Sequence, residues 1–253
     1  MGSALVTGAS RGVGRAIARA LAERGDRVAV HYGTDSAAAE ETIRAMAGTG
    51  HIAVGGDISD PEIAAEIVRV ADEEFAGVDI LVNNAAVAPS EDVHHRVDEV
   101  DYAAWQAAWR TIVDVDLLGA ANMTYLVARR LIARAKPGFV VNIGSRGAFR
   151  GEPDYPAYGA AKAGLHAFGQ SMAVALAPHG IVVTSIAPGF VSSERQAGKL
   201  DGAQGPGLRA QSPFGRVGTP EEVAQAVLFL SSPAATWSSG GVLDFNGASY
   251  LRS

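Results

Sequence analysis

The stretch Thr7-Gly8-Ala9-Ser10-Arg11-Gly12-Val13-Gly14 decides the fold, because it joins a short apolar run, Ala4–Val6, to an Ala-rich segment of helical character. Glycines at such a junction allow a tight turn, close approach of the backbone to a phosphate, and close contact between helix and strand. The exposed N–H groups and the positive end of the helix dipole then favour an anion. The spacing is G-x-x-x-G-x-G rather than the commoner G-x-G-x-x-G. The stretch predicts a dinucleotide phosphate site formed by Gly8, Ser10, Arg11, Gly12, Val13 and Gly14.

The same alternation of apolar run and helical stretch continues along the chain. The runs are continuously apolar, as expected of strands covered on both faces. The expected strands are Ala4–Val6, Arg27–His31, His51–Val54, Ile80–Val82, Phe139–Ile143, Ile181–Ile186 and Gly241–Phe245, and the expected helices are Val13–Arg24, Ser36–Ala47, Pro61–Phe75, Tyr102–Ala135, Tyr158–Ala177 and Pro220–Leu230. Repeated strand–helix–strand units predict an α/β fold, a Rossmann-like, doubly wound parallel sheet of about seven strands with helices on both faces.

No linker or repeat divides this pattern, so we expect one dinucleotide-binding and catalytic domain over residues 1–253. The segment 192–213 holds four glycines and scattered charge, which is typical of a flexible substrate lid. An ordinary disordered surface loop is the alternative for this segment.

The composition excludes several classes of protein. An apolar fraction of 48% over 253 residues is ample for a packed core. A net charge of −6 argues against a nucleic-acid partner. The absence of cysteine excludes a disulfide scaffold, a thiolate nucleophile and a Cys-ligated metal. The adjacent pair His94-His95 has no partner at metal-ligand spacing, so we expect no metal site.

Nothing in the chain resembles an export signal or a membrane anchor. The N-terminus lacks a basic region followed by an apolar stretch. The segment 163–193 carries no Asp, Glu, Lys or Arg, but Pro178-His179-Gly180 breaks it, which favours a buried helix followed by a buried strand over a membrane span. We expect a soluble, cytoplasmic protein with no membrane partner.

The end of the second expected strand indicates which dinucleotide is bound. An acidic residue about 20 positions after the glycine turn would bind the adenosine ribose and select NAD. The chain has His31-Tyr32-Gly33-Thr34 there, with no carboxylate, and Asp35 lies further out. Arg11, with Thr34 and Ser36, could receive a 2′-phosphate. The sequence therefore favours NADP(H) bound beside Tyr32, Gly33 and Thr34, and NAD(H) remains possible if Arg11 is only a solvated cation.

Tyr158 and Lys162 form the main candidate for chemistry. They lie four residues apart on one expected helix, and therefore on one helix face. An ammonium close to a phenol lowers the phenol pKa from about 10 towards working pH. Such a tyrosine can give a proton to a carbonyl oxygen or remove one from an alcohol as hydride moves. Lys162 is one of three lysines in the chain and the one charged residue of this apolar helix, so a chance pairing is a poor explanation.

These motifs, with Asn83-Asn84-Ala85-Ala86, Asn142-Ile143-Gly144-Ser145 and Pro188-Gly189 in that order, resemble the short-chain dehydrogenase/reductase family over essentially the whole chain. The nearest branch resembles the 3-oxoacyl-(acyl-carrier-protein) reductases and related secondary-alcohol dehydrogenases. The resemblance implies that Ser145 hydrogen-bonds the substrate carbonyl and stabilises the developing oxyanion. It also implies that Tyr158 is the general acid and base, and that Lys162 depresses its pKa and binds the nicotinamide ribose.

The resemblance also implies where cofactor and substrate lie. Asn84, Ala85 and Ala86 would hold the adenosine side of the groove, with Asp57 and Ile58 at the adenine. Around the nicotinamide it implies Pro188, Gly189 and Val191, and near the diphosphate Ser193. The implied substrate residues are Ser145, Arg146, Tyr155 and Phe190. Arg146 and Arg150 could meet an acidic or acyl-thioester substrate, or could simply be solvated.

Asp116 departs from the family pattern. In the stretch Trp109–Leu117 it takes the place of an asparagine that, in the family, holds a water relaying protons to the lysine. A carboxylate can accept from that water but cannot donate as an amide does. It could also pair directly with Lys162, which would favour the ammonium and weaken its effect on the phenol. We expect Asp116 to be a catalytic residue and the activity to have an altered pH profile. The alternative is that the activity is low.

The resemblance implies an NADP(H)-dependent oxidoreductase that interconverts a ketone or 3-oxoacyl group and a secondary alcohol. The alternatives are an NAD(H)-dependent secondary-alcohol dehydrogenase and a catalytically weak, dinucleotide-sensing binding protein. A helix as apolar as Tyr158–Ala177 is buried on two sides, and the sheet covers only one. We therefore expect a homo-oligomer, a dimer or a tetramer, formed through the helices at 102–135 and 158–177.

Overall fold

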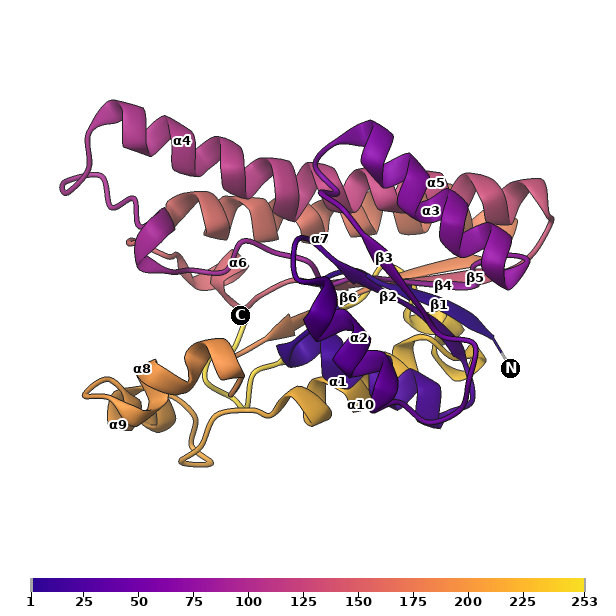
Figure 1. Ribbon diagram of the computed structural model, residues 1–253. Helices are drawn as coiled ribbons and strands as arrows, with labels where there is room; N and C mark the ends of the chain where they lie inside the picture. Colours follow the sequence, from indigo (N-terminus) through magenta and orange to yellow (C-terminus); the bar gives the residue numbers. More distant parts are fainter. Residues whose placement is uncertain (1, 253) are drawn as a thin grey trace.

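The computed structural model describes residues 2–252 and contains one parallel sheet of seven strands in the order β3-β2-β1-β4-β5-β6-β7 (Figure 1). The strands are β1 (Ser3–Val6), β2 (Arg27–Tyr32), β3 (Ile52–Gly55), β4 (Ile80–Asn83), β5 (Gly138–Ile143), β6 (Ile181–Pro188) and β7 (Val242–Phe245). The strand order reverses between β1 and β4, and ligands of such sheets bind at the carboxyl ends beside that point. The predicted fold class is confirmed.

Helices cover both faces of the sheet (Figure 1). One face carries α1 (Gly12–Glu23), α2 (Ser36–Arg44) and α10 (Pro220–Leu230), and the other carries α3 (Pro61–Phe75), α4 (Tyr102–Val113), α5 (Ala120–Ala133) and α7 (Pro156–Leu176). The short helices α6 (Gly147–Arg150), α8 (Ala197–Asp201) and α9 (Gly205–Ala210) lie towards the carboxyl ends of the strands. Short 3-10 turns complete the chain at Glu91–Val93, Ala177–His179, Glu194–Gln196 and Pro233–Ser238.

Two apolar clusters form the core, one on each face of the sheet. Ile17 and Leu21 of α1 pack with Val28 of β2 on one side. Met123 and Leu131 of α5 pack with other strand residues on the opposite side. Because both faces are covered, the strands are continuously apolar, as the sequence suggested.

The long central helix, which the sequence predicted over Tyr102–Ala135, runs without a break over Tyr102–Ala133 but is not α-helical throughout. A π-helical segment, Asp114–Gly119, separates α4 from α5. The wider turn leaves Asp116 with only 1% of its surface exposed, facing inwards. Gly119 allows close packing there, because an added Cβ would lie 2.7 Å from Ile58. The sequence predicted the long helix but not its π turn, because helical spacing in a single sequence does not distinguish an α turn from a π turn.

The uncharged segment 163–193 divides as expected into the end of α7 and strand β6, with Gly180 at φ +70 between them. By length and composition alone, the helical stretch 102–133 could cross a membrane. In the structure its two α-helical parts pack against α7 and α3, as a core helix does. The proposed lid, 192–213, forms α8, α9 and a 3-10 turn rather than a disordered loop.

Gly14 offers a direct test of the close contact between the glycine turn and β4. An added Cβ there would overlap the Gly8 carbonyl oxygen and lie 2.5 Å from Asn84 Nδ2, whereas a Cβ on Gly33 would meet nothing within 4 Å. We expect Gly14→Ala to lower the free energy of unfolding by about 1–3 kcal/mol, and Gly33→Ala by less than about 0.5 kcal/mol. Denaturant unfolding of the two variants measures this, and equal losses would contradict the packing described.

Candidate active site

The glycine turn between β1 and α1 is held from two sides. Asn84, the residue after β4, donates through Nδ2 to the carbonyl oxygens of Thr7 at 2.9 Å and Gly8 at 3.1 Å. Thr7 Oγ1 accepts in turn from the backbone N–H groups of Asn84 and Ala85, at 2.9 and 3.0 Å. The turn is thus fixed before any ligand binds.

His31 holds the turn from the side of β2, a role that the sequence did not predict. Its Nδ1 accepts from the Gly8 N–H at 3.0 Å, and its Nε2 lies 3.0 Å from the Gly56 carbonyl oxygen. Burial lowers the pKa of His31, so the ring is neutral and Nδ1 can accept. The available signal was a single polar residue inside an otherwise apolar strand.

A groove of about 470 Å³ runs along the carboxyl ends of the central strands from this turn. Most of the predicted cofactor residues line it, namely Gly8, Ser10, Arg11, Gly12, Val13, Gly14, Gly33, Thr34, Asp57, Ile58, Asn84, Ala85, Ala86 and Ser193. Gly8 and Gly12 adopt φ values of +63 and +55, which glycine accepts at little cost. The volume, the N-terminus of α1 at Gly12 and the absence of Cβ atoms at the two glycines fit a bound dinucleotide.

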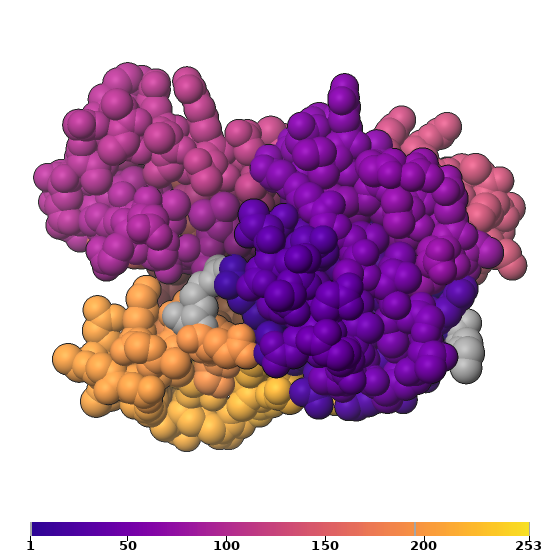
Figure 2. Space-filling view, in the orientation of Figure 1, coloured from indigo at the N-terminus to yellow at the C-terminus, as the bar shows by residue number. Residues whose placement is uncertain are grey.

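The remaining predicted cofactor residues lie elsewhere. Tyr32 packs over Gly55, where an added Cβ would lie 2.5 Å from its ring, and is not among the groove-lining residues. Gly189 and Val191 line a second cavity, described below, and Val191 forms a bridge with Gly218. The surface is hollowed between the magenta α4 region and the orange segment of α8 and α9 (Figure 2).

Ser145, Tyr158 and Lys162 converge beyond the inner end of the groove. Ser145 follows β5, and its Oγ accepts from the Gly147 N–H at 3.0 Å. Ser145 acts on the Tyr158 hydroxyl and lowers the pKa of the phenol. Lys162 Nζ lies 5.7 Å from the centre of the Tyr158 ring and donates to the Ile143 carbonyl oxygen at 3.4 Å. The three groups that the sequence assigned to catalysis therefore form one cluster.

Asp116 makes the direct ion pair with Lys162 that its position suggested. Its Oδ2 lies 3.2 Å from Lys162 Nζ, and its Oδ1 accepts from the Val87 N–H at 2.7 Å. Both side chains are buried, with 3% of Lys162 and none of Asp116 exposed. Because both charges are shielded from water, each is stabilised by the other rather than by hydration.

This pair changes the pKa argument for Tyr158. Burial lowers the pKa of Lys162, but Asp116 and Tyr158 raise it more, so its pKa lies above the ordinary value. Burial raises the pKa of Tyr158, and Lys162 and Ser145 offset this only in part, while Asp116 adds to the rise. The expectation of a lowered phenol pKa is therefore wrong in net direction. The phenol is protonated at neutral pH and ready to donate.

The start of α7 is fixed by His95, a second histidine that the sequence did not assign. His95 is fully buried. Its Nδ1 lies 2.6 Å from the Val93 carbonyl oxygen, so Nε2 is free to accept from the Ala157 N–H at 2.9 Å. A neutral imidazole thus satisfies an otherwise unpaired donor at the helix start, one residue before Tyr158. Within the described residues no three His, Asp or Glu side chains converge to hold a metal ion.

The predicted substrate residues have different surroundings. Tyr155 packs edge-on against His94 and His95, with ring centres 5.7 and 6.1 Å apart. Arg146 is buried, with 8% of its surface exposed, so it is not a solvated loop arginine. Phe190 and Arg146 line the same cavity. The sequence identified these positions but not the burial of Arg146.

His166 lies one turn beyond Lys162 on α7 and packs under the strand end that carries Ser145. An added Cβ on Gly144 would overlap its ring, and its ring stacks on Phe149 with centres 5.2 Å apart. Burial lowers the pKa of His166 to about 4, because the charged ring would lose its water. His166 is therefore neutral at working pH.

The acid stability of the protein depends on this group. An unfolded chain binds a proton on His166 near pH 6.5 and the folded chain only near pH 4, so the free energy of unfolding falls as the pH drops between these values. We expect His166→Met to remove up to about 3 kcal/mol of this fall. Unfolding at pH 7, 5.5 and 4 measures it, with exposed His179→Gln as control; wild type and His166→Met losing stability in parallel would contradict it.

Comparisons with known proteins agree with this site. A family model described as enoyl-(acyl carrier protein) reductase matches residues 8–247. A 3-oxoacyl-(acyl-carrier-protein) reductase of Vibrio cholerae is 36% identical over 98% of this chain and 97% of its own. A cis-4-hydroxycyclohexanecarboxylate dehydrogenase of Sinomonas cyclohexanicum is 37% identical over 96% and 94%.

A solved structure has the same fold. It is a provisionally named gluconate dehydrogenase from Agrobacterium tumefaciens, which superposes with a TM-score of 0.88 at 30% identity, over 98% of this chain and 95% of its own. These relatives are dehydrogenases and reductases, matched over almost their full length. The chain therefore belongs to the short-chain dehydrogenase/reductase family and is an oxidoreductase acting on CH–OH donors.

Proposed function

We propose that the protein interconverts a ketone or 3-oxoacyl group and a secondary alcohol with NADP(H), using Tyr158 as the general acid and base. The observation that carries this proposal is the cluster of Ser145, Tyr158 and Lys162 at the carboxyl edge of the sheet, beside a groove that fits a dinucleotide. The relatives are named for 3-oxoacyl, hydroxycyclohexanecarboxylate and rhamnose substrates, each of which has a carbonyl group or an alcohol.

The residues divide the chemistry between them. NADP(H), when bound, supplies or accepts the hydride. In reduction, the Tyr158 hydroxyl gives its proton to the carbonyl oxygen, and the Ser145 hydroxyl donates a hydrogen bond to that oxygen as it gains negative charge. The Lys162 ammonium stabilises the phenolate that remains. Asp116 holds the ammonium in place and keeps it charged.

The groove supports NADP(H) over NAD(H). At the two positions where NAD selection would need a carboxylate, the chain has Tyr32 and Gly33. The carboxylate of Asp35 accepts from the Ala38 N–H at 3.0 Å and so caps α2. Arg11 lies exposed on the groove wall, where its fork can bind a 2′-phosphate. An NAD(H)-dependent enzyme remains the second candidate.

The outer surface supports a homo-oligomer. Large apolar side chains are exposed on the two helices expected at the interface, with Tyr102, Leu118 and Tyr125 on the central helix and Val174 on α7. Val174 is 79% exposed, a costly exposure for an aliphatic side chain that a partner copy would cover. The alternative of a dinucleotide-sensing binding protein does not explain why the protonated phenol of Tyr158 lies beside the buried ammonium of Lys162.

Substituting Tyr158 tests the proposal directly. We expect the wild type to reduce ketones, faster at equal concentration with NADPH than with NADH, as measured by loss of reduced-nicotinamide absorbance. Tyr158→Phe should lower kcat about 10²–10⁴-fold and leave NADPH binding, measured by fluorescence, almost unchanged. Tyr125→Phe, on the exposed face of α5, is the control. Undiminished reduction by Tyr158→Phe would show that the phenol is not the acid.

Asp116→Asn tests the effect of the ion pair on the pH profile. The amide removes a negative charge that raises the pKa of Tyr158. Tyr158 also raises the pKa of Lys162, so the ammonium stays charged beside the phenolate in Asp116→Asn and the pKa of Tyr158 should fall. Alcohol oxidation, which needs the phenolate, should then begin at lower pH, and reduction should decline at lower pH. Both are followed as kcat/KM against pH, with exposed Asp114→Asn as control. Superimposable profiles for wild type and Asp116→Asn would contradict the role given to Asp116.

A further inference from the structure

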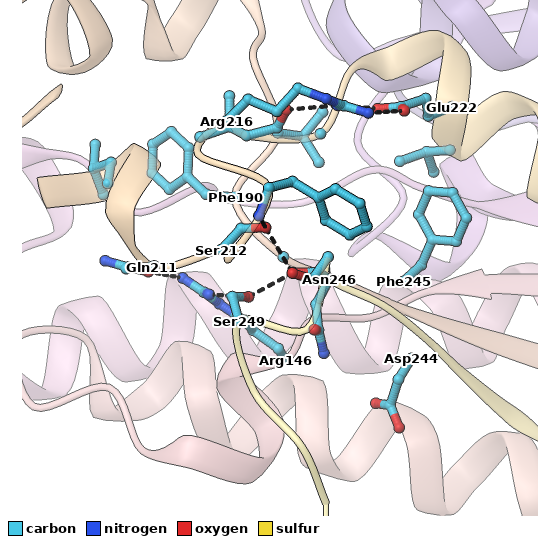
Figure 3. A pocket seen from close by; sticks show the side chains of 18 residues that line it. Arg146, Phe190, Gln211, Ser212, Arg216, Glu222, Asp244, Phe245, Asn246 and Ser249 are labelled. Carbon is cyan, nitrogen blue, oxygen red and sulfur yellow. Dashed lines mark hydrogen bonds and ion pairs between the residues drawn. The ribbon is translucent and has the colours of Figure 1, made fainter. Parts of the chain in front are cut away.

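Arg146 carries a buried positive charge directly beside the catalytic serine. Its backbone N–H donates to the Pro188 carbonyl oxygen at 3.0 Å, so the residue is fixed between the ends of β5 and β6. Its guanidinium donates to Ser249 Oγ in the C-terminal segment and to Gln211 Oε1 at the end of α9 (Figure 3). Both acceptors are neutral. Arg146 therefore connects the catalytic strand, the lid and the C-terminal segment.

The guanidinium lies in the wall of a cavity of about 290 Å³. The other walls are mainly apolar, formed by Phe190, Leu208, Phe214, Val217, Val223 and Phe245. Gly189 and Val191, next to the expected nicotinamide position, also line the cavity. The cavity is at the small end of the range for ligand pockets, roughly 300–1,000 Å³. It suits a compact molecule rather than a long chain.

The charges around this cavity are paired except for one. Arg216 is bonded to Glu222 at 2.6 and 2.9 Å on the far wall (Figure 3). Asp244 is bonded to Arg252 at 2.7 Å. Among the described residues, no carboxylate oxygen lies within 4.0 Å of the Arg146 guanidinium. The cavity thus presents one cation whose charge the surrounding chain does not neutralise.

The cation is held at an energetic disadvantage. Burial and then the charge of Arg150 lower the pKa of Arg146, and the smaller opposing effect of Glu152 does not offset them. A buried charge without a counter-charge is strongly unfavourable, and two hydroxyl or amide acceptors compensate for it only in part. A carboxylate can bind both N–H edges of a guanidinium at once and supply the missing charge.

We propose that this cavity binds the carboxylate of the substrate, so that the enzyme acts on a small keto acid or hydroxy acid. The carboxylate replaces Gln211 and Ser249 on Arg146, and the apolar part of the acid lies against the phenylalanine side chains. The carbonyl carbon then extends past Gly189 towards Ser145 and Tyr158. This inference rests on the proposed function, and it deepens it by favouring free acids over acyl thioesters, whose reacting end carries no carboxylate.

The test compares acids with their neutral amides. The spacing between carboxylate and carbonyl is varied with acetoacetate, 4-oxopentanoate and 5-oxohexanoate, each paired with its primary amide. We expect kcat/KM for at least one acid to exceed that of its amide about tenfold or more. Arg146→Met should lower kcat/KM for that acid about 100-fold, mainly through KM, and change the value for the amide less than about threefold. Arg146→Lys should be intermediate, because it keeps the charge and loses the fork.

Arg44→Met is the matched control, because Arg44 is exposed at the end of α2 and does not line the cavity. It should leave both acid and amide rates unchanged. Equal rates for acid and amide in the wild type, or equal losses for both in Arg146→Met, would overturn the proposal. If no ketone is reduced at all, the proposed function fails separately. Stabilisation of the wild type by these acids, but not of Arg146→Met, in thermal unfolding still shows the carboxylate site.

Discussion

The ion pair between Lys162 and Asp116 sets the conditions for everything else at the catalytic centre. A lysine as buried as Lys162 would lose its proton in an apolar site, and a neutral amine could not stabilise a phenolate. Asp116, 3.2 Å away, keeps the ammonium charged. Buried pairs contribute little net stability, because desolvation offsets their attraction. The pair therefore matters for the charge state of the site more than for the stability of the fold.

The fold places this pair by local devices that lie outside the chemistry. The π-helical turn 114–119 directs Asp116 inwards, and the Val87 N–H fixes one oxygen of its carboxylate. His95 satisfies the start of α7 just before Tyr158. His31 and Asn84 likewise hydrogen-bond the backbone of the glycine turn, from opposite sides. Neutral polar side chains thus determine the positions of the charged ones.

The sequence predicted the fold, and placed Tyr158 and Lys162 on one helix face, because both follow from local patterns. The role of Ser145 came from the family resemblance. Apolar runs, glycine spacing and the four-residue step from Tyr158 to Lys162 need no knowledge of distant contacts. Contacts between segments far apart in the chain determine the roles of His31, His95 and the buried Arg146. The spacing of residues in the sequence does not predict such contacts. The net pKa of Tyr158 was misjudged for the same reason, since burial is a property of the packed structure.

Lys162 and Arg146, the two buried cations near Ser145, differ in how their charge is balanced. This difference distinguishes a fixed part of the catalytic centre from a site that we propose for ligand. Lys162 has its counter-charge within the protein, so its environment is the same whether or not substrate is bound. Arg146 has only the neutral acceptors Ser249 and Gln211, and Gln211 lies at the end of α9. In the binding mode that we propose, the carboxylate of an acid displaces these two acceptors from the guanidinium. A neutral ketone supplies no counter-charge and leaves them in place, so selectivity for acids follows from one uncompensated guanidinium.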